Sequence, residues 1–176
     1  MGFWSGLLRP KESGRRSVKA VVVGAEMADS ILGDESQGNA LAELAKLSGV
    51  FDSLVKSPVA RNEWAYLQVA GFDLAVALIT KDQPQIRDAI SEAFYTKVTT
   101  ACGAKRFAEL RRALAEYAEA INRRDPQHGT TLPVGKVFAK RCAADGNLVL
   151  ALAAGSAFVT NYTSDVTFLK GFDIVL

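Results

Sequence analysis

The chain of 176 residues contains a single histidine, His128, and only two cysteines, Cys102 and Cys142. Zinc and iron sites of the common types need several such ligands, so these residues cannot build one within the chain. Helical di-metal carboxylate sites add Glu-x-x-His pairs, and the sequence contains none. The cysteines have no CxxC spacing, which indicates a reducing compartment and two thiols that pack as small apolar side chains. We therefore expect no metal and no cofactor.

The sequence also lacks a long hydrophobic run. Its longest one, residues 148–159, spans 12 residues and includes Gly155 and Ser156, whereas a membrane-spanning helix needs about 20 residues. The first residues do not resemble a secretory signal, because their apolar part precedes their basic part. These absences predict a cytoplasmic protein, with peripheral attachment to the inner face of a membrane as the alternative.

Groups that could bind phosphate or act as a general base are equally scarce. The segment VVVGAE at residues 21–26 looks like the strand and turn of a nucleotide-binding fold. However, no second glycine follows Gly24 at the spacing that such a turn requires. His128 lies in a PQHG turn and has no nucleophile beside it in the sequence. Because general-base catalysis needs a positioned partner, we interpret His128 as a solvated loop residue.

Asp73 is an acidic residue in a strongly apolar segment, since Phe72 and Leu74 flank it. We expect it to be partly buried and paired with Arg61, or with a lysine of another helix, as an ion pair that fixes helix register. No catalytic residue is assigned on this basis. An enzyme of unknown class that uses His128 or Asp73 remains the third hypothesis for function.

Apolar residues at helical spacing, by contrast, recur from residue 17 almost to the end of the chain. Hydrophobic residues make up 49% and charged residues 23%, which is ordinary for a globular domain. We predict an all-α fold, a single-domain helical bundle of about seven helices over residues 17–176, after a basic and apolar tail of residues 1–16. The third and seventh helices, near residues 58–80 and 147–162, should lie closest to the centre because they are apolar on more than one side or rich in small residues.

Local signals place several helix ends. Ser57 followed by Pro58 predicts a helix start, as does Asp82 with Gln85 in a capping box. Gly103 predicts a break between the fourth and fifth helices. Two stretches stay open: residues 18–24 suit a helix or a short buried strand, and residues 164–176 suit a last short helix or an extended arm.

The N-terminal tail carries the clearest signal for a partner. A short helix would place Phe3, Trp4, Leu7 and Leu8 on one face, and basic residues follow at Arg9, Lys11, Arg15 and Arg16. This combination suits docking on the chain's own bundle, on a partner's groove or on an anionic membrane surface. We favour a protein over a membrane, because Pro10 limits the segment to about two turns. No aromatic residue interleaves the arginines, so nucleic acid is not the expected partner.

The chain end is unusually apolar, with Phe172, Ile174, Val175 and Leu176 among its last five residues. Because chain ends are normally polar and frayed, these residues predict packing in the core or across a subunit interface. The sequence therefore favours a non-enzymatic helical interaction or adaptor module that binds another protein or self-associates. The second hypothesis is a peripheral membrane protein tethered by the segment Phe3–Leu8.

Overall fold

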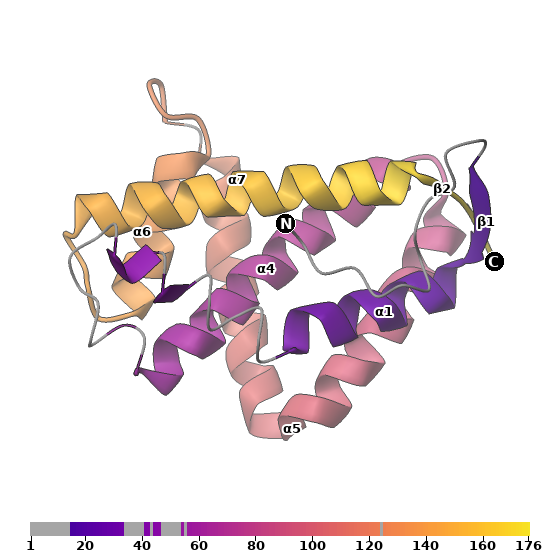
Figure 1. The fold of residues 1–176 in the computed structure, drawn as a ribbon, viewed down its shortest axis with the longest axis horizontal. Coiled ribbons are helices and arrows are strands. Elements are labelled where there is room, and N and C mark those ends of the chain that lie inside the picture. Colours follow the sequence, from indigo (N-terminus) through magenta and orange to yellow (C-terminus); the bar gives the residue numbers. More distant parts are fainter. Residues whose placement is uncertain (1–14, 34–40, 43, 47–53, 55, 124) are drawn as a thin grey trace.

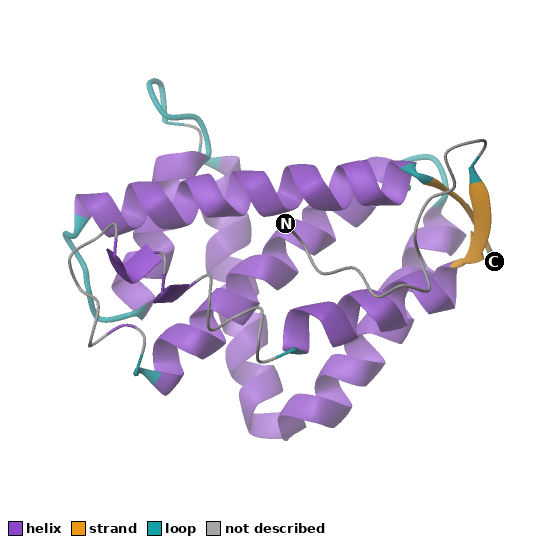
Figure 2. Ribbon diagram, in the orientation of Figure 1, coloured by secondary structure: helices purple, strands orange, loops and turns teal. Residues whose placement is uncertain are grey.

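The chain is described by a computed structural model, which covers residues 15–33, 41–42, 44–46, 54, 56–123 and 125–176 (Figure 1). The predicted all-α class is confirmed (Figure 2). The predicted docking residues Phe3, Trp4, Leu7, Leu8, Arg9 and Lys11 lie outside the described residues.

Five long helices make up most of the described chain: α1 (Ala20–Leu32), α4 (Pro58–Ile79), α5 (Pro84–Asn122), α6 (Thr131–Arg141) and α7 (Leu148–Lys170). Further helical residues occur at 41–42 and 44–46. Within the described part of the chain this gives six helices rather than about seven.

The fourth and fifth predicted helices are joined, which accounts for the difference in number. Gly103 adopts φ 71° and ψ 165°, so the backbone turns there as the glycine signal predicts, yet the helix resumes directly as the second half of α5. The predicted capping box is wrong, because α5 begins at Pro84 after Gln83 and its first turn has no side-chain cap. The predicted start at Ser57 is confirmed, since the Ser57 hydroxyl accepts a hydrogen bond from the Ala60 amide at 3.3 Å.

α4 lies at the centre of the bundle. It packs against each of the other four long helices, and one continuous cluster of buried side chains runs through all of them. The ring of Phe72 on α4 meets that of Phe94 on α5 with centroids 4.6 Å apart. α7 runs along one side of the molecule and packs against α4 and against α6, which crosses behind it in Figure 1, and its buried residues lie on one of its faces.

A small parallel sheet joins the two ends of the described chain. β1 (Arg16–Lys19) pairs with β2 (Phe172–Val175), with Val18 opposite Ile174. Both stretches left open by the sequence are thereby resolved. The chain is a strand through Lys19 and a helix from Ala20, while α7 continues to Lys170 and is followed by the extended arm.

Candidate functional site

The outer face of α7 is the most distinctive surface of the described chain. A stripe of residues at alternating steps of three and four runs along it: Val149, Leu152, Ser156, Val159, Thr163, Val166 and Lys170. Val149 is 55% exposed and Val159 is 37% exposed, whereas Leu152 and Val166 are partly buried against the chain's own core. This is the spacing of positions a and d in a heptad, which places all seven side chains on one side of the helix.

Lys170, the last residue of this stripe, is its one charged residue. Between Leu148 and Leu169 the only charged residue is Asp165, and that residue is buried on the opposite side of the helix. Three threonines on the outer face, Thr160, Thr163 and Thr167, donate their hydroxyls to carbonyl oxygens one turn earlier in α7, at 2.8–3.0 Å. Their methyl groups remain for contact. Solvent-facing helices are normally charged, so a continuous uncharged face is typical of a surface that another helix covers.

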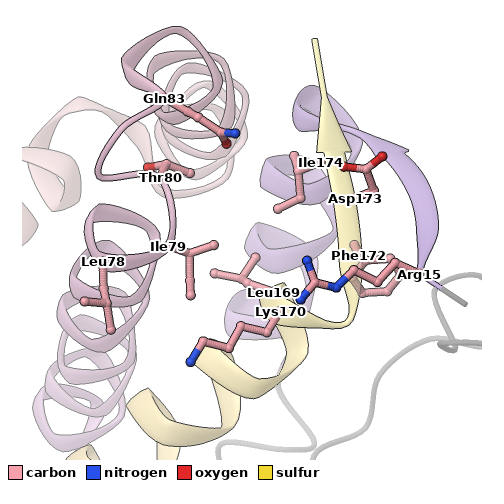
Figure 3. A pocket seen from close by; sticks show the side chains of 10 residues that line it. All are labelled: Arg15, Leu78, Ile79, Thr80, Gln83, Leu169, Lys170, Phe172, Asp173 and Ile174. Carbon is pink, nitrogen blue, oxygen red and sulfur yellow. The ribbon is translucent and has the colours of Figure 1, made fainter.

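A cavity of about 460 Å³ lies at the end of the bundle where α7 meets β2 (Figure 3). Leu78, Ile79, Leu169 and Ile174 form its apolar walls, and Arg15 extends into it from the residue before β1. Its volume falls in the range of small-ligand pockets, about 300–1,000 Å³. The hydroxyl of Thr80 in the wall is already bonded to the Val76 carbonyl at 2.6 Å. The polar groups at the rim carry both signs of charge and do not converge on one point.

A buried ion pair joins α4, α5 and α6, and sequence reasoning missed it. Arg141 donates two hydrogen bonds to the Glu63 carboxylate, at 2.6 and 2.9 Å, and a third to Glu116 at 2.6 Å. Burial raises the pKa of Glu63, although the bonds from Arg141 oppose that shift. Because a buried pair of this kind is costly to desolvate, we assign it to helix register rather than to net stability. Glu63 and Arg141 are 78 residues apart, so no local pattern in the sequence indicates that these two side chains are in contact.

Asp73 pairs with a tyrosine rather than with a cation. The hydroxyl of Tyr95 on α5 donates a hydrogen bond to the Asp73 carboxylate. The expected ion pair with Arg61 or a lysine is therefore wrong. Burial raises the pKa of Asp73 to about 6, while the hydrogen bond from Tyr95 lowers it. The pair ties α4 to α5.

His128 and the two cysteines have ordinary structural settings. The His128 ring lies 3.0 Å from an Asp125 carboxylate oxygen, which also accepts the backbone amides of Gln127 and His128 and so closes an exposed turn. None of the interactions described for His128 links it to Asp73. Cys102 and Cys142 are unpaired and half-buried. Burial and the nearby Glu63 carboxylate raise the pKa of Cys142 to about 12, so this thiol is protonated at neutral pH.

The residues predicted from the two chain ends separate into buried and exposed groups. Phe172 is 4% exposed and stacks edge-on against Phe168, so it belongs to the chain's own core. Ile174 lines the cavity, whereas Val175 and Leu176 remain exposed, at 39% and 64%. Of the basic residues, Arg15 lines the same cavity and Arg16 pairs with Phe172 in the sheet.

No three histidine, cysteine, aspartate or glutamate side chains among the described residues are grouped so that they could hold a metal ion. None of the helices, within the same residues, combines the length and apolarity that crossing a membrane requires. Comparison of the chain with protein-family models, with curated proteins and with solved structures found no match.

Proposed function

We propose that this chain is a non-enzymatic helical protein–protein interaction module that self-associates, and that the outer face of α7 is the surface it uses. The observation that carries the proposal is the uncharged stripe at heptad spacing, in which Val149, Ser156, Val159 and Thr163 are exposed. Burying such a stripe removes apolar area from water without desolvating a charge, which favours association.

An enzymatic role has less support. General acid–base chemistry needs two or more polar groups that converge on a substrate position. Of the buried acids with a raised pKa, Glu63 and Asp73 are each already bonded within the bundle, to Arg141 and to Tyr95, and burial alone accounts for the shift of Asp165. Their arrangement suits the assembly of helices rather than the binding of a substrate.

The proposal is tested by light scattering on the intact chain at concentrations from about 10 µM to 1 mM. We expect the mass to rise from 18.9 kDa toward twice that value. Val159→Glu places a charge in the middle of the stripe and should keep the chain monomeric, because burying an unpaired carboxylate costs several kcal/mol. Circular dichroism of the variant should match that of the wild type.

A matched control is available on α4, where Val59 is 51% exposed but distant in sequence from the stripe. Val59→Glu adds the same charge to a different surface and should leave the concentration dependence unchanged. A wild-type mass that stays at 18.9 kDa over the whole range would contradict self-association. Equal loss of association in both variants would contradict the choice of α7 as the surface.

A further inference from the structure

We propose that this chain binds an extended peptide of a partner protein as a third strand, in the groove between β2 and the C-terminal end of α4. The groove is the cavity of about 460 Å³ at the end of the bundle. The peptide runs antiparallel to β2, with aliphatic side chains on the apolar walls and its C-terminal carboxylate at Arg15 and Lys170. The inference does not depend on self-association through α7.

The first observation is the unpaired edge of β2. Within the described residues β2 pairs with β1 on one side, and the sheet has no third strand on the other. The N–H and C=O groups of every second residue of β2 therefore point away from β1 with no strand to receive them. An edge of this kind binds an extended chain through main-chain hydrogen bonds.

The cavity lies along that edge. Phe172, Asp173 and Ile174 all line it, although successive side chains of a strand point to opposite faces of a sheet. A cavity that meets three successive residues adjoins the edge of the strand rather than one of its faces. Figure 3 shows β1 on one side of β2 and the end of α4 on the other. The groove is therefore bounded by a strand edge and by a helix.

The walls of the groove suit aliphatic side chains. Leu78 on α4 is 50% exposed although it lines the cavity, and Ile79, Leu169 and Ile174 complete the apolar lining. β2 has four residues, so a peptide strand beside it covers about 13 Å at about 3.3 Å per residue. The polar groups of the rim do not converge on one point, which suits an extended chain better than a compact ligand.

Charge at one end of the groove selects the direction of the peptide. Lys170 comes just before β2, and Arg15 precedes Arg16, which pairs with Phe172 at the start of β2. An antiparallel peptide places its C-terminal carboxylate beside these two cations, whereas a parallel one would place its N-terminal amine there. Asp173 also lines the groove, but its carboxylate lies toward the opposite end (Figure 3). The C-terminal ends of α4 and α7 each add a partial charge of about −0.5, which the two cations outweigh.

The probe that tests the proposal is an N-acetylated pentapeptide of alternating valine and threonine that ends in valine with a free carboxylate. The intact, isotope-labelled chain is titrated with this peptide, and NMR follows its amide resonances. We expect saturable shifts at Phe172–Val175, with a dissociation constant of about 10 µM to 1 mM. A peptide of the same side chains with methylated main-chain nitrogens cannot donate to the strand edge and should not bind.

The carboxylate is tested by a second peptide that ends in an amide, which should bind about tenfold more weakly. Lys170→Gln removes one cation and should weaken the acid peptide about fivefold while leaving the amide peptide unchanged. Lys105→Gln changes an exposed lysine of α5 that does not line the cavity, and it should alter neither affinity. Equal affinity for the two peptides in the wild type would overturn the proposed direction.

Three further results would overturn the proposal. One is the absence of shifts at Phe172–Val175 with about 5 mM peptide, or equal shifts with the methylated peptide. The second is tighter peptide binding after Leu7→Ser and Leu8→Ser, which would assign the groove to the chain's own N-terminal segment. The third is tighter binding by the monomeric Val159→Glu chain than by the wild type, which would assign the groove to a second copy. Unchanged affinity in both of these variants supports a partner's peptide as the occupant.

Discussion

Asp165 is the acidic residue whose surroundings change its protonation most. It is 9% exposed, and burial raises the pKa of its carboxyl from 3.8 to about 7, with no hydrogen bond or ion pair among the described residues to offset the cost. Between about pH 4 and pH 7 the folded chain therefore holds a proton that the unfolded chain has released. The stability that the folded state gains from the protonated Asp165 carboxyl is fully present below about pH 4 and is lost as the pH rises through 7.

We expect Asp165→Asn to raise the free energy of unfolding at pH 8 by about 2–4 kcal/mol and to flatten its decline between pH 4 and pH 7. Asp73, with a pKa of about 6, shifts in the same direction, so part of the wild-type slope should remain. Urea unfolding at several pH values measures both effects. Asp88→Asn changes a carboxyl that is 72% exposed and is the control. If the free energy of unfolding of Asp165→Asn declined with pH as steeply as that of the wild type, the Asp165 carboxyl would not be the cause of the decline.

Single residues also show where sequence reasoning succeeded and where it failed. The apolar character around Asp73 correctly indicated burial, because the signal lies in its immediate neighbours. The partner, Tyr95, is 22 positions away on another helix, and many cations were equally plausible from the sequence. Arg141 reaches Glu63 across 78 positions for the same reason. Long-range pairs depend on how helices dock, which no local pattern specifies.

At the scale of elements, the contact between α6 and α7 depends on two glycines. A Cβ atom on Gly155 would lie 1.9 Å from the Thr131 carbonyl oxygen, and one on Gly135 would lie 1.6 Å from that of Ala151. Both distances are far shorter than a van der Waals contact, and the atoms that would clash belong to the helix backbone, which cannot move aside. The two helices therefore pack backbone to backbone, which holds α7 in place and directs its opposite face to solvent.

Gly155→Ala should destabilise the protein by at least about 3 kcal/mol, because α6 and α7 must separate to admit the methyl group. Gly71 is the matched control, since a Cβ there would meet the Phe158 ring at an ordinary 3.7 Å. Gly71→Ala should change stability by about 1 kcal/mol or less, helped by the better helix propensity of alanine. The shift in the midpoint of urea unfolding compares the two variants. Similar losses of stability in the two variants would mean that the close approach of α6 and α7 does not determine the cost of Gly155→Ala.

The pattern of elements was predictable wherever it depended on neighbours in sequence. Periodicity and the Ser57 cap located α4, and Gly103 marked a real change in backbone direction. Residues 18–24 were left open between helix and strand, because β2, the partner of the strand Arg16–Lys19, is more than 150 positions away. The heptad spacing on α7 is present in the sequence, but the small residues of that helix predicted a position near the centre of the bundle, so its exposed face was not predicted.

At the scale of the whole molecule, the β1–β2 pair closes the bundle by joining both ends of the described chain to one core. Phe172 and Val18 are 4% and 8% exposed and belong to the same continuous cluster as Trp64 on α4. A single cluster without an internal boundary favours unfolding in one cooperative transition. The sheet should therefore unfold together with the helices.

Phe172→Ala tests that coupling, with Trp4→Phe in the background so that Trp64 is the only fluorophore of its kind. Removing a buried phenylalanine costs about 3–5 kcal/mol. Because Trp64 lies against Phe138 in the core, its fluorescence and the helical circular dichroism should shift by the same amount in urea. Val175→Ala, on the exposed side of the same strand, should shift neither by more than about 1 kcal/mol. If the sheet were a separate unit, Phe172→Ala would leave the Trp64 transition where it is, and the two ends would then be an attachment to the bundle rather than part of its cooperative core.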